Sequence, residues 1–143
     1  MNSNTRTIYA SDLSAERHHP LFESRVPAGF PSPAADYEED RLDLNRYLIR
    51  HPAATFFVRA VGDSMIGAGI HCGDLLVVDR SLEPKDKSVV IAVIDGELTV
   101  KRIRIEKRKI TLEPENKSYS ARQITEDADF QVWGVVTNVI HAL

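Results

Sequence analysis

An all-β fold, with one short helix and an extended N-terminal arm, is predicted for this chain of 143 residues. Six runs of β-branched and aromatic residues follow one another from residue 55 onward. Gly, Asp, Pro and Asn separate these runs, as they do at turns. A single segment ahead of them has the apolar spacing of an amphipathic helix.

The composition is that of one folded unit with a tail, large enough to bury a core without disulfides or metal. Hydrophobic residues make up 43% and charged residues 27%, and the net charge of -3 gives no general attraction to nucleic acid. Cys72 has no second cysteine to pair with, which fits a reducing compartment. No apolar run is long enough to span a membrane and the opening residues lack the core of a secretory signal, so we expect a cytoplasmic protein.

Residues 1–40 are interpreted as an N-terminal arm, and residues 41–143 as the folded domain. Within the arm, "RVPAGFPSPAADYEED" (25–40) holds three prolines, a glycine and four acids. No helical or strand period is sustained there, so we expect no regular element in residues 25–40.

The next segment, "DLNRYLIRHP", predicts a short helix. Asp43 is a suitable N-cap, and Leu44, Tyr47 and Leu48 fall on one face. Pro52 then stops the helix.

The strands follow in order, each bounded by turn residues. Asp95-Gly96 is typical of a two-residue hairpin turn between two of them. The last run is long and almost wholly apolar, so it is either a central strand or an edge strand that needs a partner chain. The expected strands are residues 55–62, 74–80, 88–95, 97–105, 109–115 and 130–143.

The strand "TVKRIRI" (99–105) places a lysine among apolar side chains. Alternation puts Val100 and the two arginines on one face, and Thr99, Lys101 and two isoleucines on the other. A buried lysine loses hydration, which lowers its pKa and makes it a base at neutral pH. The alternative is that Lys101 lies at a strand end with its head in water.

Ser64, in "VGDSM", follows a strand and a glycine, where the backbone can turn sharply and expose a hydroxyl beside free N–H groups. Such a turn can present a nucleophile. Gly-Asp-Ser is also common in turns that have only a structural role, and that alternative stays open.

A nucleophilic serine needs a base, and the chain offers two kinds. A Ser-His-Asp triad could draw on any of five histidines, none of which its sequence context singles out. A Ser-Lys dyad needs only one desolvated lysine, and Lys101 fits. Thr99, on the same face, could hydrogen-bond the amine and orient it toward Ser64. The histidines are His18, His19, His51, His71 and His141.

The motifs "AGFPSPA", "GDSM", "GDLLVVDR" and "ELTVKR", in this order, resemble those of the LexA/UmuD family of self-cleaving serine peptidases. The resemblance runs from about Leu21 to the C-terminus. It implies that Ser64 is the nucleophile, that Lys101 is the general base, and that the chain cuts its own Ala28-Gly29 bond. Small residues on both sides of that bond would let the nucleophile approach closely. Without a dyad, Ala28-Gly29 would be interpreted as a flexible turn.

The same resemblance implies the fold, the partners and the role. It implies the coiled β-sheets of a LexA-like catalytic domain and a homodimer without a cofactor. It also implies cleavage stimulated by the RecA filament in the SOS response to DNA damage. The cut dimer would join UmuC as an error-prone translesion polymerase. Backbone N–H groups of Ser64 and Asp63 would stabilise the oxyanion.

Some of the family's properties do not carry over, and other functions stay open. The first 20 residues offer no match and are too short for a helix-turn-helix domain, so operator binding is not expected. One alternative is a regulatory binding module with an inactive dyad, which acts through partners in its uncut form. Another is a peptidase that acts on other proteins.

Four further features have mainly structural interpretations. The basic run "KRIRIEKRK" (101–109) could touch DNA, although alternation makes most of it a solvated face. Cys72 and His71 are neighbours whose side chains would diverge on a strand. Met65 is expected to pack under the turn of Ser64, and Trp133 to fill the core or a dimer interface. No spacing of His, Cys and carboxylates indicates a metal site.

Overall fold

The computed structural model describes residues 8–10, 16–22, 26–29 and 38–143, and these form two compact units. One unit comprises Met1–Ser11 and His51–Leu143, and the other comprises Asp12–Arg50. The all-β prediction is confirmed, since strands dominate and α1 (Leu44–Leu48) is the one α-helix among the described residues. None of the described helices is long or apolar enough to cross a membrane.

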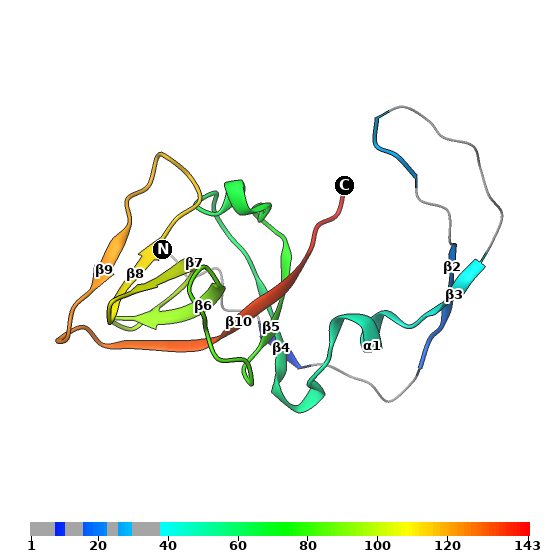
Figure 1. The fold of residues 1–143 in the computed structure, drawn as a ribbon, viewed down its shortest axis with the longest axis horizontal. Helices are drawn as coiled ribbons and strands as arrows, with labels where there is room; N and C mark the ends of the chain where they lie inside the picture. The colour runs from blue at the N-terminus through cyan, green and yellow to red at the C-terminus, as the bar shows by residue number, and fades with distance from the viewer. Residues whose placement is uncertain (1–7, 11–15, 23–25, 30–37) are drawn as a thin grey trace. The chain divides into compact units, whose positions relative to one another are not determined.

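The larger unit is built on one eight-stranded antiparallel sheet (Figure 1). Its order is β1-β4-β5-β10-β6-β7-β8-β9, so the long apolar run at the end of the chain is a central strand between β5 and β6. The strands are β1 (Ile8–Ala10), β4 (Thr55–Arg59), β5 (Leu75–Asp79), β6 (Val89–Ile94), β7 (Glu97–Glu106), β8 (Lys109–Glu113), β9 (Arg122–Ile124) and β10 (Phe130–Ile140).

The smaller unit pairs β2 (His19–Phe22) with β3 (Glu38–Leu42). The expectation of no regular element in residues 25–40 is therefore wrong for residues 38–40, because pairing with a distant segment supplies backbone hydrogen bonds that the acidic sequence does not reveal. Residues 30–37 of the expected arm lie outside the described residues.

The predicted helix is present but shorter than expected. Asp43 is its N-cap, as expected, and the carboxylate accepts a hydrogen bond of 3.0 Å from the Asn45 N–H. The helix ends at Leu48 because Ile49 is extended, with φ -113°, and a 3-10 turn follows at Pro52–Ala54.

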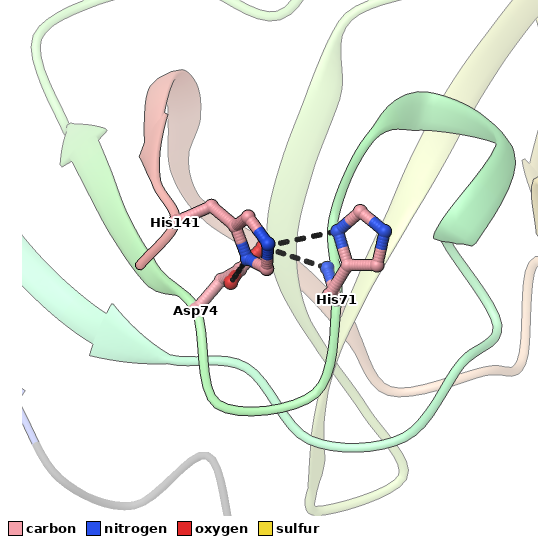
Figure 2. A group of neighbouring side chains, drawn as sticks. All are labelled: His71, Asp74 and His141. Atoms are coloured by element: carbon pink, nitrogen blue, oxygen red, sulfur yellow. Dashed lines mark hydrogen bonds and ion pairs between the residues drawn. The ribbon is translucent and has the colours of Figure 1, made fainter. Parts of the chain in front are cut away.

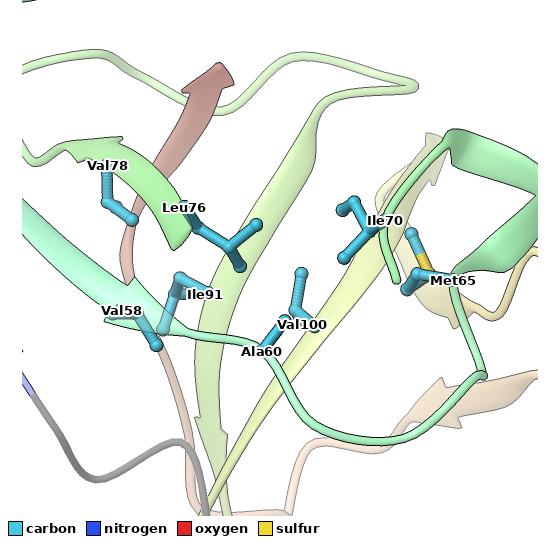
Figure 3. Packing of buried hydrophobic residues seen from close by; sticks show 8 residues of the cluster. All are labelled: Val58, Ala60, Met65, Ile70, Leu76, Val78, Ile91 and Val100. Carbon is cyan, nitrogen blue, oxygen red and sulfur yellow. The ribbon is translucent and has the colours of Figure 1, made fainter. Parts of the chain in front are cut away.

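A hydrophobic core lies between the strands and the loop after β4 (Figure 3). β4, β5, β6 and β7 contribute to it, and Met65 and Ile70 enter from the loop. A second cluster packs on the other face of β6 and β7, so these strands bury side chains on both faces. Met65 is buried, as expected, and Trp133 packs against the first cluster. The first cluster is Val58, Ala60, Met65, Ile70, Leu76, Val78, Ile91 and Val100; the second is Val90, Ala92, Ile103 and Leu112.

Lys107, Arg108 and Lys109 are exposed, as expected of a solvated face, but two arginines of β7, Arg102 and Arg104, are only partly exposed and form ion pairs. Arg102 pairs with Glu115, and Arg104 pairs with Asp86, Glu106 and Glu113. Only 28% and 29% of the two arginine side chains are exposed. Acids therefore pair with two of the six basic residues of the run 101–109.

Candidate active site

Ser64 lies in the loop that follows β4, immediately before a 3-10 turn at Ile66–Ala68. Gly62 has φ +85°, which lets the chain leave the strand direction sharply. Met65 anchors the loop, since its side chain is only 2% exposed in the first core cluster. The packing of Met65 therefore fixes the backbone turn, while Ser64 itself is half-buried.

The segment that follows β8 holds the same turn through backbone hydrogen bonds. The Glu115 N–H donates to the Ser64 carbonyl, and the Gly67 N–H donates to the Glu115 carbonyl, both at 2.8 Å. A Cβ on Gly67 would lie 2.7 Å from the Glu115 oxygen, so only glycine fits without movement. Sequence reasoning missed Gly67, because its requirement arises from a contact made 48 residues further along the chain.

Lys101 projects from β7, where it is paired with Val90 of β6. Its Nζ lies 3.1 Å from Ser64 Oγ, 2.8 Å from Thr99 Oγ1 and 3.1 Å from the Val100 carbonyl oxygen. Among the described residues, no carboxylate forms an ion pair with Lys101. Burial lowers the pKa of the Lys101 ammonium below its ordinary value, because the charged form loses hydration without a compensating anion.

The structure thus brings together Ser64, Lys101 and Thr99 by side-chain contacts. Asp63 is adjacent but exposed, and its carboxylate accepts a hydrogen bond of 2.5 Å from the Tyr119 hydroxyl. That carboxylate raises the pKa of Tyr119. The Asn116 side chain also donates to the Asp63 carbonyl at 2.9 Å, so the 116–119 segment braces the residue before Ser64.

Two backbone donors remain available at the turn. Within the part of the chain that the structure describes, the N–H groups of Asp63 and Ser64 donate no hydrogen bond. Backbone N–H groups without an acceptor are the kind of donor that can stabilise an oxyanion.

The histidines form separate contacts. His51 pairs with Asp79 at 2.6 Å, and His141 pairs with Asp74 at 2.5 Å. In the described ranges, no histidine hydrogen-bonds to Ser64, so lysine is the base that this geometry offers.

Ala28 and Gly29 belong to the smaller unit, and both are exposed. An added Cβ on Gly29 would meet no atom within 4 Å. Local packing in the structure therefore does not require glycine at this position.

Comparison with known proteins reveals clear relatives. Residues 20–137 match the family model described as Peptidase S24-like. The chain is 57% identical over 122 residues to Protein SamA of Salmonella typhimurium, covering 85% of this chain and 84% of SamA. It is 46% identical over 133 residues to Protein MucA of Escherichia coli, covering 92% and 90% of the two chains. It is 37% identical over 116 residues to the LexA repressor of Xylella fastidiosa, covering 81% of this chain and 54% of the repressor.

Proposed function

Because the chain belongs to the Peptidase S24-like family, we propose that it is a serine peptidase that cuts its own Ala28-Gly29 bond. The single observation that carries the proposal is the 3.1 Å contact between Ser64 Oγ and the desolvated amine of Lys101. A hydroxyl needs a base within this distance before it can attack a carbonyl.

The three neighbours of Nζ match the bonding capacity of a neutral amine. Such an amine has two N–H donors and one lone pair. The donors would go to Thr99 Oγ1 and the Val100 carbonyl, which leaves the lone pair to accept the Ser64 O–H. Thr99 and the strand backbone thus orient the base.

In the first step, Lys101 takes the proton of Ser64 as Oγ bonds to the carbonyl carbon of Ala28. The N–H groups of Ser64 and Asp63 stabilise the oxyanion, and removal of one such donor typically costs about 3 kcal/mol. The C–N bond then breaks, and the Lys101 ammonium gives its proton to the leaving amine of Gly29. Water finally hydrolyses the acyl-enzyme, which releases a peptide ending at Ala28 and a chain beginning at Gly29.

The wider role rests on the resemblance to the LexA/UmuD family and on the identity to SamA and MucA. We propose that the RecA filament favours a cleavage-competent arm after DNA damage, as part of SOS mutagenesis. The cut chain would form a homodimer that joins a UmuC-like polymerase in the cytoplasm for translesion synthesis. Tethering keeps the arm at a high local concentration, so such control of the arm is needed.

Incubation of the full chain over a rising pH series tests the proposal. Because burial lowers the pKa of Lys101, the rate should rise with pH and level off once the amine is neutral. Mass spectrometry should find a new N-terminus at Gly29, and Ser64→Ala or Lys101→Ala should abolish it. His51→Asn, which removes a histidine outside the site, should leave it intact.

The alternatives give different results. A binding module with an inactive dyad gives no cut at any pH, with or without the RecA filament. A peptidase that acts on other proteins cleaves an added arm peptide over many turnovers. A cut that persists in Ser64→Ala would exclude the proposed nucleophile.

A further inference from the structure

Outside the proposed active site, His71, Asp74 and His141 converge at one end of the sheet (Figure 2). His71 and Asp74 lie in the turn that leads into β5, and His141 follows β10 directly. The pairing of Ile140 with Leu75 brings these two segments together. Strand register therefore assembles the cluster from residues that are far apart in sequence.

The ligand atoms of the cluster face one another. His141 Nδ1 lies 2.5 Å from Asp74 Oδ1, and His71 Nδ1 lies 3.6 Å from Asp74 Oδ2. One nitrogen or oxygen from each of the three residues lies within 4.8 Å of the others. His71 Nδ1 is buried and has no hydrogen-bond partner among the described residues, although a buried polar atom normally has one.

The turn that carries two of these residues is fixed before any ligand binds. The His71 N–H donates to Asp74 Oδ2 at 2.7 Å, and the Asp74 N–H donates to the His71 carbonyl at 3.1 Å. Gly73 and Asp74 also exchange backbone hydrogen bonds with Ala60, both at 2.8 Å. Gly73 has φ +93°, a conformation that favours glycine.

The charges suit a cation. The Asp74 side chain is 3% exposed, and in the described part of the chain it is paired with histidines and with no lysine or arginine. Arg59 approaches this turn only at the Gly73 carbonyl. The rings of His71 and His141 are 45% and 42% exposed, which leaves a path from solvent.

We propose that His71, Asp74 and His141 bind one Zn²⁺ ion, with water completing a tetrahedral site. Two imidazole nitrogens and one carboxylate oxygen are an established donor set for zinc with an open fourth position. Zn–ligand distances of about 2.0–2.1 Å place neighbouring ligand atoms about 3.4 Å apart. The separation of 3.6 Å between His71 Nδ1 and Asp74 Oδ2 is already close to this. His141 Nδ1 contacts the other oxygen, Oδ1, at 2.5 Å, so its side chain would have to move for all three residues to bind one ion.

The proposed site differs from our expectation from sequence spacing that the chain has no metal site. That spacing gave no signal, because His141 lies 67 residues beyond Asp74 and only the β5–β10 register joins them. A Zn²⁺ ion bound here would link the segment after β10 to the turn before β5 through its ligands. The proposal does not depend on cleavage at Ala28-Gly29, and its test uses no cleavage measurement.

The test is a Zn²⁺ titration of the full chain, freed of metal and placed in competition with a chromophoric chelator. We expect one Zn²⁺ per chain, and His71→Ala and His141→Ala should each weaken binding at least about tenfold. Co²⁺ should give the visible absorption of a tetrahedral site in the unaltered chain and lose it in both variants. Zn²⁺ should raise the melting temperature of the unaltered chain and of neither histidine variant.

Two control variants make the result specific. His51→Asn disrupts the other histidine–aspartate pair, which has no third ligand, and Cys72→Ser removes the exposed thiol beside His71. Both should bind Zn²⁺ like the unaltered chain. Because both histidine rings are partly exposed, the alanine variants should keep their circular dichroism spectrum. Absence of binding, equal binding by the histidine variants, or loss of binding in Cys72→Ser would overturn the proposal.

Discussion

Thr99→Val is the most informative perturbation of the proposed dyad. Valine keeps the shape of threonine but removes the oxygen that lies 2.8 Å from Lys101 Nζ. Two of the three neighbours of the amine then remain, Ser64 Oγ and the Val100 carbonyl. The change therefore weakens the orientation of the base without removing it.

The magnitude follows from the bonds that are lost. A hydrogen bond to a charged group contributes about 1.5–3 kcal/mol and a neutral one about 0.5–1.5 kcal/mol, so the ammonium loses about 1 kcal/mol more than the amine. The pKa of Lys101, already lowered by burial, should fall further. The midpoint of the pH–rate profile should move toward acid by somewhat less than one pH unit, since about 1.4 kcal/mol corresponds to one unit. The plateau rate should fall about fivefold through poorer orientation.

The assay is self-cleavage of the full chain at each pH, quantified by mass spectrometry of the fragment that begins at Gly29. A nitrogen-15 NMR titration of the Lys101 amine measures the same pKa independently of cleavage. Thr99→Ser retains the hydroxyl and serves as the matched control, with an unchanged midpoint.

A midpoint that stays in place, or moves toward alkaline pH, would refute the reasoning. It would mean that the Thr99 oxygen does not stabilise the ammonium in solution. An equal loss in Thr99→Ser would show that packing, not the hydroxyl, matters at this position.

Three further predictions follow. Gly67→Ala should slow cleavage at least tenfold, because its Cβ would lie 2.7 Å from the Glu115 backbone oxygen, next to the turn of Ser64. Gly134→Ala is the control, because its Cβ would lie 2.7 Å from the Val78 side chain. This control should lower stability but leave the cleavage rate of the folded molecules unchanged. Lys101→Met should raise the urea midpoint of unfolding at neutral pH, because methionine can be buried without losing a charge. The difference in midpoint between the variant and the unaltered chain should shrink as pH rises toward 10.5, because between the lowered and the ordinary pKa the unfolded lysine binds more protons than the folded one. A difference that grows with pH contradicts this. Met65→Ala should lower the free energy of unfolding in urea by about 2–5 kcal/mol, because the side chain is buried. Leu44→Ala, at a position that is 56% exposed, should lower it by less than about 1 kcal/mol. Equal losses would refute the anchoring role of Met65.

Six of the eight strands of the large sheet could be predicted because their signals are local, whereas β1 and β9, of three residues each, were missed because they are too short to show a period. Alternation, β-branched residues and turn residues placed all six expected strands within a few residues of their observed ends. The Asp95-Gly96 turn was predicted correctly, with φ of +49° and +83° at its two residues. The position of β10 stayed open between centre and edge, because sheet order depends on pairing partners that periodicity does not name.

The candidate site divides in the same way. A lysine in an apolar row and a serine after Gly-Asp were visible in the sequence, and the structure places them 3.1 Å apart. The bracing contacts were not visible, because Tyr119 reaches Asp63 across 56 residues. The ion pair between Arg102 and Glu115 was missed for the same reason. Isolated polar residues in loops follow no helical or strand period, so their hydrogen-bond partners become known only from the folded structure.

The central place of β10 also affects when the proposed active site can assemble during synthesis. In the sheet order, β4 and the serine loop lie on one side of β10, while β7 with its lysine lies on the other. Translation produces β10 after both, so Ser64 and Lys101 are present in the nascent chain before the strand that joins their two parts of the sheet. Under the proposed function, cleavage at Ala28-Gly29 would therefore follow the insertion of β10 into the sheet.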